Sequence, residues 1–377
     1  MDSFSQYKFC EVAKLINGRA YLMPELQDSG KYRIVRVGNF SGKDEWFFSD
    51  MELEDDKYCF QGDLLFCWSC TFGPYIWKAE KTIYHYHIWK IEVNPEKADK
   101  YYLFYYLKFL TPQLLGGTNG CTMAHITKEN MERKKILIHT SVSVQKKIAS
   151  ILKSYDDFIE NNNKRIKILE QMAQELYKEW FVRLRFPGYK TSKIIDGIPE
   201  GWQTDKIESI GVFRRGKNIT ASEMVVGNIP VISAGIEPSG FHNKSNAEGV
   251  SITISSSGAN AGFLRVNYSD IWAADCLYVN NVENVFYLYE LLNNIRPYID
   301  NLQRGAAQPH VYAKDVNRLK IVLPSEHIRT KFNNLVKDMH QSIAILAQQN
   351  ANLAKQRDLL LPRLMSGNLE LKGIPDA

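Results

Sequence analysis

Few residues in this chain have the spacing that a catalytic site requires. Ser255-Ser-Ser-Gly258 resembles the Gly-x-Ser-x-Gly turn of serine hydrolases only superficially, because the first glycine is missing. The sequence contains no Asn/Asp-Pro-Pro-Tyr/Phe tetrad, which would indicate amino-group methylation. It also lacks the Gly-x-x-x-x-Gly-Lys-Ser/Thr loop that binds nucleotide phosphates. We therefore expect that this chain is not an enzyme.

Cysteine and histidine pairs offer one candidate metal set. Cys67-x-x-Cys70 is followed by His85-x-His87, and both residue types bind zinc. Neither pair has a flanking Gly-rich knuckle, and both lie in strand-like runs, so we expect no metal site. The six cysteines form no disulfide framework for a chain of 377 residues, which favours reduced thiols and a cytoplasmic location.

The composition is that of an ordinary soluble protein, with 45% hydrophobic and 24% charged residues. No run approaches the roughly 20 apolar residues of a membrane span. The first residues have no basic and apolar segments of a signal peptide, so we expect no membrane association. A net charge of +5 permits a polyanionic partner without requiring one.

Any binding residues must be positioned by two long amphipathic segments. In both, apolar residues recur at alternating steps of four and three, which is typical of the a/d seam of a coiled coil. The first seam comprises Ile148, Leu152, Tyr155, Ile159, Asn162, Ile166, Leu169, Ala173, Leu176 and Trp180. The second lies 184 residues later and comprises Phe332, Val336, Met339, Ile343, Leu346, Asn350, Leu353, Arg357, Leu360 and Leu364. The pattern predicts two long helices and an internal repeat.

Two asparagines in the seams indicate how the helices pair. In an antiparallel pair Asn162 faces Asn350, whereas a parallel pair places both amides opposite aliphatic residues. Two buried amides without partners would cost about 1–3 kcal/mol each, so we predict an antiparallel coiled coil. The same register gives two further pairs, Trp180 with Phe332 and Tyr155 with Arg357, the latter a cation–π pair. The alternative is two separate amphipathic helices, each packed on its own domain.

The remaining sequence divides into globular parts. Short alternating runs punctuated by Gly and Pro indicate α+β domains with curved, mixed sheets. The expected boundaries are a first domain at 1–140, a central helix at 141–185, a linker at 186–201, a second domain at 202–324, and a C-terminal helix and tail at 325–377.

The two domains are also related by the repeat, although less closely than the helices. The first has an expected strand at 82–88 and a helix at 98–110, and the second a helix at 285–295. Five residues recur unchanged 185 positions later, from Gly120, His125, Arg133, Lys135 and Ile136 to Gly305, His310, Arg318, Lys320 and Ile321. The domain centres match weakly. Two copies of one module with unlike surfaces indicate two different half-sites on one ligand.

Several local strings closely resemble the specificity subunits of Type I restriction–modification enzymes. They are Asp157-x-x-Ile-Glu160-Asn-Asn-Asn-Lys-Arg-Ile166, Leu169-Glu-Gln-Met-Ala-Gln-Glu-Leu-Tyr-Lys-Glu-Trp180-Phe181, Gly197-Ile-Pro-Glu-Gly-Trp202 and Arg357-Asp-Leu-Leu-Leu-Pro-Arg-Leu-Met-Ser-Gly367. The resemblance covers nearly the whole chain. One departure concerns the Gly-Trp that opens the second domain at Gly201-Trp202. Near the start of the chain Tyr7 stands in the tryptophan's place, so we expect reduced docking elements there.

The resemblance implies a non-catalytic subunit with two similar target-recognition domains, separated by two long helices with pseudo-twofold symmetry. Each domain would read one half of a bipartite, gapped double-stranded DNA site. The helices, whose seams span roughly 50 Å, would set the gap and dock two methyltransferase subunits. Translocase–nuclease subunits would complete the restriction complex. The methyltransferase subunits would bind S-adenosylmethionine, so no cofactor is expected in this chain.

The candidate DNA-contacting residues are basic or small polar side chains in loops, the types that bind phosphates and base edges. In the first domain they are Arg33, Arg36, Lys43, Lys78, Thr118 and Asn119; in the second they are Arg214, Arg215, Lys217, Ser255, Ser256, Ser257, Asn260, Gln308 and His310. Each basic residue taken alone is more simply a solvated surface charge. The matched pair His125 and His310 is interpreted as structural turn residues or phosphate contacts, and Trp68 as core. The alternative function is a coiled-coil scaffold or regulatory protein-binding homologue without DNA modification.

Overall fold

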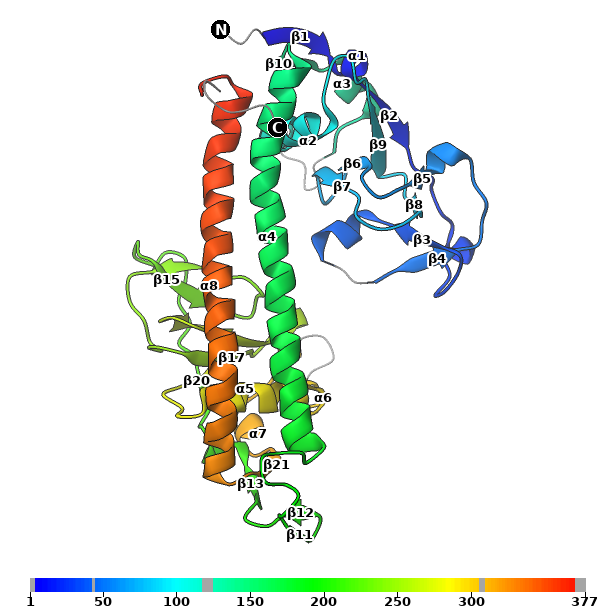
Figure 1. Ribbon diagram of the computed structural model, residues 1–377. Coiled ribbons are helices and arrows are strands. Elements are labelled where there is room, and N and C mark those ends of the chain that lie inside the picture. The colour runs from blue at the N-terminus through cyan, green and yellow to red at the C-terminus, as the bar shows by residue number, and fades with distance from the viewer. Residues whose placement is uncertain (1–3, 43–44, 117–124, 305–308, 370–377) are drawn as a thin grey trace. The chain divides into compact units, whose positions relative to one another are not determined.

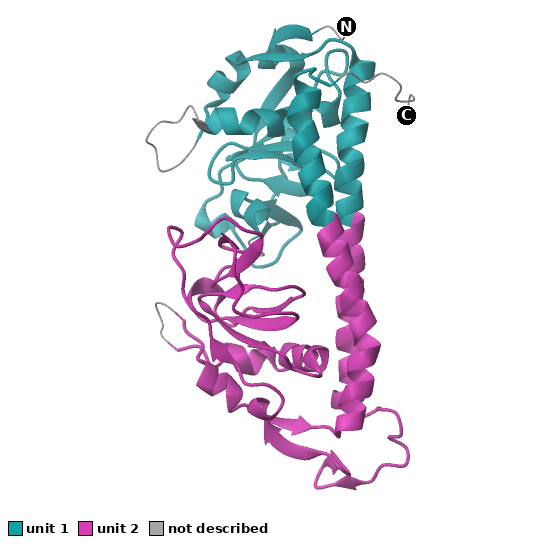
Figure 2. Ribbon diagram, turned by 90° about the vertical axis from the view of Figure 1, so that its left-hand side faces the viewer, with its two compact units in different colours: residues 1–160, 350–377 teal, residues 161–349 magenta. Residues whose placement is uncertain are grey.

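The computed structural model describes residues 4–42, 45–116, 125–304 and 309–369. The chain divides into two compact units (Figure 2): unit 1 comprises residues 1–160 and 350–377, and unit 2 comprises residues 161–349. Two long helices, α4 (Val142–Tyr177) and α8 (Glu326–Met365), contribute to both units. Among the described helices, none is long and apolar enough to cross a lipid bilayer.

Both long helices follow the predicted seams. Every seam residue is buried or half-buried. In unit 1, Arg357 of α8 forms an ion pair with Asp156 of α4. In unit 2, Trp180, in the π-helical turn Lys178–Val182 that ends α4, lies with its ring 5.7 Å from that of Phe332. Residues early in α4 therefore meet residues late in α8, and the reverse, so each unit contains an antiparallel helix pair, as predicted (Figure 1).

The polar positions of the seam are only partly as expected. The partner of Arg357 is the carboxylate of Asp156, one residue beyond the predicted Tyr155. An ionised carboxylate attracts a guanidinium more strongly than an aromatic ring does, which explains this choice. Asn162 is buried in unit 2, and Asn350 belongs to unit 1, so the predicted amide pair stays a prediction.

Local sequence explains where the long helices begin and end. The Ser141 hydroxyl accepts a hydrogen bond from the Val144 N–H, which satisfies one free donor at the start of α4. Beyond the end of α4, Pro187 cannot continue a helix, and Gly188 has φ +91°. The last turn of α8 is followed by Gly367, with φ +73°.

In the described part of unit 1, two four-stranded sheets accompany a two-stranded pair. The antiparallel sheet has the order β2 (Ala13–Asn17), β9 (Ile88–Val93), β6 (Leu64–Cys67), β7 (Gly73–Ile76). The mixed sheet has the order β4 (Phe47–Ser49), β3 (Tyr32–Val35), β8 (Thr82–Tyr84), β5 (Tyr58–Cys59), with β3 and β8 parallel. The pair is β1 (Phe4–Lys8) with β10 (Lys135–His139), and the helices are α1 (Phe9–Val12), α2 (Lys100–Gly116) and α3 (Lys128–Arg133).

Unit 2 has related sheets in its described residues. The antiparallel sheet has the order β14 (Arg214–Arg215), β20 (Cys276–Asn280), β17 (Ser251–Ser255), β18 (Leu264–Asn267). The mixed sheet has the order β16 (Gly240–His242), β15 (Ile229–Ile232), β19 (Trp272–Ala273). The two-stranded pairs are β13 (Gln203–Lys206) with β21 (Lys320–Leu323) and β11 (Ile194–Ile195) with β12 (Ile198–Pro199). The helices are α5 (Val285–Asn294), α6 (Arg296–Asp300) and α7 (Ala313–Asn317). The α+β class and the mixed sheets are as predicted.

The main core of each unit includes the seam of the long helices. In unit 1, Tyr102 and Leu103 of α2 pack in one cluster with Leu152 of α4 and Leu364 of α8. In unit 2, Tyr287 of α5 packs in one cluster with Trp180, Phe332 and other helix residues. Burial of these large side chains stabilises each pairing by roughly 1.5–3 kcal/mol per residue. The globular part of each unit is thereby held to its segment of the helix pair.

Strand register corrects the expected place of the opening aromatic residue. Tyr7 pairs with Ile136 in β1–β10, whereas Asp205 pairs with Ile321, the repeat counterpart of Ile136, in β13–β21. Tyr7 therefore corresponds to Asp205, and Phe4, three residues earlier, corresponds to Trp202. The Phe4 ring packs 4.1 Å from His139, as the Trp202 ring packs 4.9 Å from Phe186. The predicted assignment of Tyr7 was wrong, because Phe4, the first residue of β1, stands at the place of Trp202.

The expected strand at 82–88 is also wrong. The structure has two strands there, β8 ending at Tyr84 and β9 beginning at Ile88, joined by a turn. In this stretch Tyr84, Tyr86 and Ile88 alternate with His85 and His87, which mimics the period of two that is typical of a strand. The turn lies at a rim of unit 1 that has a counterpart in unit 2.

Candidate nucleic-acid interface

In unit 2 two serines meet one aspartate where strands β17 and β20 end. Ser255 pairs with Cys276, so the residues after Ser255 lie opposite Asp275. Ser256 Oγ donates to Asp275 Oδ1 over 2.6 Å, and Ser257 Oγ donates to Asp275 Oδ2 over 2.5 Å. We call Ser256, Ser257 and Asp275 the Asp275 node. It places three small polar side chains at one rim of the sheet.

Exposed basic residues flank the Asp275 node. Arg215 Nη2 lies 3.8 Å from Asp275 Oδ1, and the Arg215 side chain is 66% exposed. Lys217 is exposed, and its N–H donates to the Ala273 carbonyl over 2.9 Å. Burial raises the pKa of Asp275, but the two serine hydrogen bonds and the charges of Arg215 and His310 outweigh it, so the pKa lies below its usual value. The carboxylate is therefore ionised at neutral pH.

His310 completes this rim through its backbone. It forms β-bridges with Ser257 and with Arg304, and its N–H donates to the Arg304 carbonyl over 2.9 Å. The Val311 N–H donates to the Ser256 carbonyl over 3.0 Å. The half-buried His310 thus lies on a segment that backbone hydrogen bonds join to the node. This agrees with its interpretation as a structural turn residue, while the phosphate contact stays a prediction.

The other candidates in unit 2 are placed less favourably. Ser255 is 3% exposed and donates to the Ala234 carbonyl over 3.0 Å, so its side chain points into the protein and the prediction for Ser255 was wrong. A strand residue on the inner face cannot reach a groove. Arg214 is exposed on β14, and Asn260 is half-buried in the 3₁₀ turn Gly258–Asn260. Gln308 lies outside the described residues.

Unit 1 has the same framework at the corresponding place. Cys67 pairs with Ile88 in β6–β9, as Ser255 pairs with Cys276, so Trp68, Ser69 and His87 correspond to Ser256, Ser257 and Asp275. Ser69 forms a β-bridge with His125, as Ser257 does with His310. The matched histidines therefore fasten equivalent rims in the two units.

The side chains on this framework are unlike those of unit 2. Trp68 Nε1 donates to the Tyr86 carbonyl over 2.9 Å, and the Trp68 ring lies 4.9 Å from the His87 ring. Trp68 is half-buried at the edge of the core, while Tyr86 is 39% exposed. Burial lowers the pKa of His87, and the nearby Arg36 charge acts in the same direction, so the imidazole is neutral at pH 7. We call Trp68, Tyr86 and His87 the aromatic rim.

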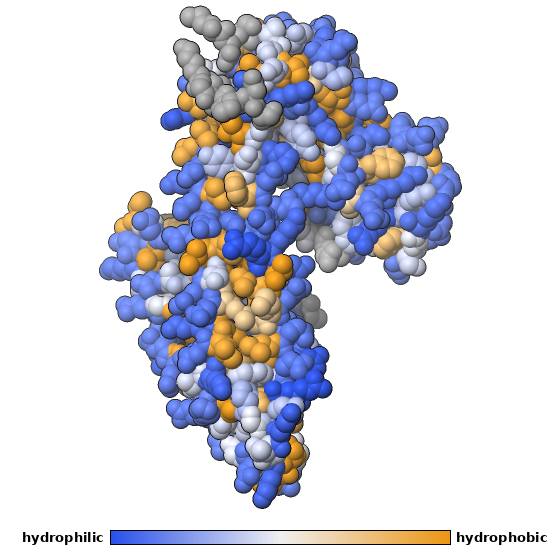
Figure 3. Space-filling view, viewed as in Figure 1, coloured by the Kyte–Doolittle hydropathy of each residue, from blue (hydrophilic) through white to orange (hydrophobic). Residues whose placement is uncertain are grey.

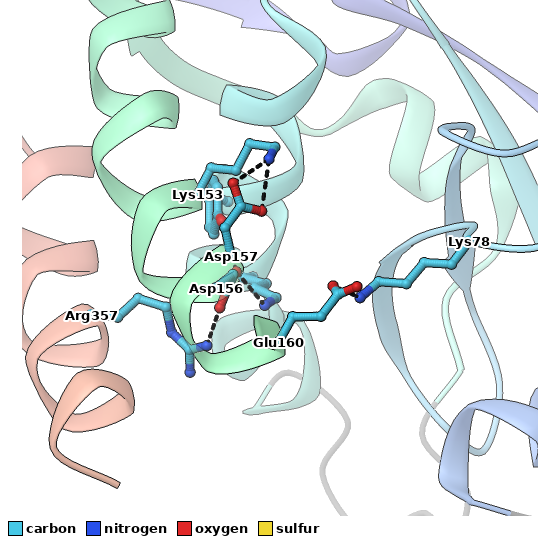
Figure 4. A network of polar contacts seen from close by, with 8 residues as sticks. Lys78, Lys153, Asp156, Asp157, Glu160 and Arg357 are labelled. Atoms are coloured by element: carbon cyan, nitrogen blue, oxygen red, sulfur yellow. Dashed lines mark hydrogen bonds and ion pairs between the residues drawn. The ribbon is translucent and has the colours of Figure 1, made fainter. Parts of the chain in front are cut away.

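The candidate basic residues of unit 1 have partners of their own. The Arg33 guanidinium lies 5.4 Å from the Trp46 ring centroid, and that of Arg36 lies 5.1 Å from the Phe47 ring centroid, yet both residues are exposed. Lys78 forms an ion pair with Glu160 of α4 (Figure 4), which gives it a structural role. Lys43, Thr118 and Asn119 lie outside the described residues.

The sequence did not single out Asp275, Tyr86 or His87 as contact residues. Their positions depend on the pairing of strands that are distant along the chain, β17 with β20 and β6 with β9. One signal was available, because His125 and His310 recur at the repeat spacing and each bridges to the rim. The two cysteines of the candidate zinc set differ in exposure, since Cys67 is buried and Cys70 is exposed. In the described part of the chain, no group of three or more His, Cys, Asp or Glu residues could hold a metal ion.

The architecture is that of a duplicated recognition module on paired helices, and sequence comparison gives its family. A profile for the Type I restriction modification DNA specificity domain matches residues 1–171 and 199–355, so the chain belongs to this family. It is 28% identical to the specificity subunit of the type I restriction enzyme MjaIX of Methanocaldococcus jannaschii, over 72% of this chain and 69% of that protein. It is 22% identical to the MjaVIII specificity subunit of the same organism, over 83% and 80% of the respective chains.

A solved structure shares the fold. The S subunit of a Type I restriction–modification system from M. genitalium superposes with a TM-score of 0.61 at 18% identity, covering 96% of each chain. Two related domains and long helices are thus the architecture of this family, as the resemblance implied.

Proposed function

We propose that this chain reads a bipartite, gapped double-stranded DNA site, one half per domain, as the specificity subunit of a Type I restriction–modification complex. The observation that carries this proposal is that equivalent positions of the two units hold unlike chemistry on one framework. Trp68 and His87 in unit 1 stand where Ser256 and Asp275 stand in unit 2. Two readers of the same half-site would need the same contacts, whereas two unlike half-sites need different ones.

The charges beside these rims favour a polyanionic ligand. Arg214, Arg215 and Lys217 are exposed beside the Asp275 node, and Arg36 is exposed near the aromatic rim. Such side chains bind phosphates and orient a protein on the duplex, while the rim residues would contact base edges. Each phosphate contact releases counterions, so binding should weaken steeply with salt.

Protein partners would dock on the long helices. Large apolar side chains are exposed on the unit 2 part of both helices, namely Ile168 and Met172 on α4 and Leu335 and Ile345 on α8. Figure 3 shows apolar surface gathered over this part of the molecule. Exposed apolar groups on otherwise polar helices indicate a protein interface. We infer two methyltransferase subunits, with S-adenosylmethionine bound by them, and translocase–nuclease subunits as partners in the cytoplasm. This chain would contribute no catalytic group.

The test is duplex binding by the chain assembled with its methyltransferase subunit. We expect retention of duplex DNA that falls steeply as salt rises from 50 to 200 mM, by on the order of 10³-fold if six or more phosphates are contacted. A complex that forms but retains no duplex at any salt concentration would favour the scaffold alternative. The apolar helix residues are the specific observation on which that alternative rests.

A further inference from the structure

We propose that Ser257, held by Asp275, accepts a hydrogen bond from the exocyclic amino group of a base in the half-site of unit 2. The amino group would be adenine N6 or cytosine N4. This inference rests on the proposed function and adds the chemical class of the group that is read. It also makes Asp275 a positioning residue, which acts on DNA through the serine.

The hydrogen-bond inventory of the Asp275 node leads to this assignment. An ionised carboxylate has no proton to donate, so both serine hydroxyls must donate to it. A free serine can donate to or accept from a base edge, but a serine whose proton is already engaged can only accept. Among base edges in the major groove, the amino groups of adenine and cytosine are the donors.

Exposure selects Ser257 rather than Ser256. Ser256 is 5% exposed, whereas Ser257 is half-buried. Ser257 is also followed by Gly258, with φ +72°, where the chain turns away from the sheet. The Ser257 hydroxyl is thus the member of the node that a ligand can reach while Asp275 holds it from behind.

The charge of the node points to bases rather than to the phosphate backbone. The ionised Asp275 carboxylate disfavours a phosphate at the node itself. Two hydroxyl donors and Arg215 partly neutralise it, so that the node can lie beside a duplex. Arg215 itself remains 66% exposed and is free to approach a phosphate. The arrangement therefore places an acceptor beside an exposed cation, which suits a base edge next to a phosphate.

Unit 1 supplies the contrast. Ser69 corresponds to Ser257, but His87 stands in place of Asp275, and the described hydrogen bond of the Ser69 hydroxyl is with Cys70 Sγ at 3.6 Å, where either atom can donate. The Ser69 hydroxyl is therefore not restricted to accepting. Ser69 is also only 8% exposed, so unit 1 offers no reachable serine at this place. The two half-sites should therefore differ at the base pair that Ser257 faces.

The experiment expresses Asp275→Asn with the methyltransferase subunit and maps N6-methyladenine across the host DNA. An asparagine amide can donate to one serine and so release its proton, allowing Ser257 to donate to a carbonyl or ring nitrogen. We expect one position in one half of the recognised motif to become degenerate, with its base preference reduced roughly tenfold. The other half-site should be unchanged.

Two further variants keep the test decisive. Ser257→Ala removes the acceptor with little effect on folding, since the residue is half-buried, and should relax the same position. Asp205→Asn is the matched control. The Asp205 carboxylate also accepts a hydrogen bond, from the Lys206 N–H over 2.8 Å, but it lies in β13 and not in the Asp275 node. A complex with this variant should therefore methylate the wild-type motif.

The inference is overturned if Asp275→Asn and Ser257→Ala assemble and methylate the wild-type motif without any degenerate position. It is also overturned if methylation falls evenly at all sites, because that result would mean that the node only stabilises the local structure and does not contact a base. If Asp275→Asn fails to assemble, Ser257→Ala alone decides. A wild-type complex that yields no bipartite motif would instead contradict the proposed function.

Discussion

Arg357 of α8 forms an ion pair with Asp156 of α4 (Figure 4). Asp156 also accepts a hydrogen bond from the Tyr105 hydroxyl of α2 over 2.7 Å. One carboxylate therefore joins the two long helices and the globular part of unit 1. The side chains of Arg357 and Asp156 are 20% and 28% exposed, so water screens the pair only partly. This contact sets the helix register in unit 1.

Removing either partner should destabilise unit 1. We expect Asp156→Ala and Arg357→Ala each to lower the free energy of unfolding by about 1–3 kcal/mol, because each breaks a partly buried ion pair and leaves only a neighbouring charge as partner, Asp358 for Arg357 or Lys108 for Asp156. The double variant should cost less than the sum of the two, with a coupling of about 0.5–3 kcal/mol measured by urea unfolding. Strict additivity would show that the ion pair does not form. Lys153→Ala, which removes an exposed pair with Asp157 one turn away, is the control and should cost about 0.5 kcal/mol or less.

The seam of unit 2 can be tested with two residues of one helix. Phe332 is fully buried against Trp180, whereas Leu335, on the same helix, is 48% exposed. We expect Phe332→Ala to cost about 3–5 kcal/mol and Leu335→Ala less than about 1 kcal/mol, measured by chemical denaturation. Equal losses would mean that Phe332 is no more tightly packed than Leu335, which would contradict the seam assigned to α8.

Basic residues beside the Asp275 node should contribute to affinity without changing the sequence read. For Lys217→Ala in the assembled complex, we expect weaker binding to all duplexes and a slope of log affinity against log salt that is smaller by about 1. Lys206→Ala, in the β13–β21 pair, provides a matched loss of one charge and should leave the slope unchanged. An unaltered slope for Lys217→Ala would remove this residue from the interface.

Half-buried His85 predicts a pH dependence of stability. Burial lowers the pKa of His85 to about 4, and the neighbouring His87 and the Arg36 charge act in the same direction. In the unfolded chain the pKa is about 6.5, so the unfolded state binds more protons between these values. The free energy of unfolding should therefore fall as the pH drops from about 6.5 to about 4 and level off below that.

The measurement is urea unfolding at pH 7 and pH 5. His85→Gln should lose less stability than the wild type on acidification, because it has no imidazole to protonate. His125→Gln changes an exposed histidine and should follow the wild type. If His85→Gln shows the full wild-type loss, the acid sensitivity has another source.

Periodic features were predictable from the sequence, whereas pairings across the chain were not. The a/d seam identified both long helices, because ten apolar positions at regular steps specify one face of a helix. The observed α8, Glu326–Met365, lies within the expected C-terminal segment 325–377. Short aromatic runs were ambiguous, so His85–His87 was taken for strand. Tyr7 was assigned to the tryptophan's place because counting from the chain start ignores strand register, which places Phe4 there.

The candidate contacts were predicted by residue type and corrected by geometry. Arg215, Ser256, Ser257 and His310 do meet at one rim, but Asp275, on which they converge, precedes a strand distant in sequence. Residue type alone could not distinguish Ser257, which is half-buried, from Ser255 and Ser256, which are 3% and 5% exposed. The direction of each side chain depends on alternation along β17 and on the end of that strand at Ser255. Both are set by the pairing of β17 with β20 in the sheet.

The central claim is that this chain gives a methyltransferase its sequence specificity. The most direct measurement is a map of N6-methyladenine in a host that expresses the wild-type chain together with its methyltransferase subunit. We predict a new motif with two unlike half-sites and a fixed gap, which disappears when this chain is deleted. A stable complex that adds no new motif would contradict the account.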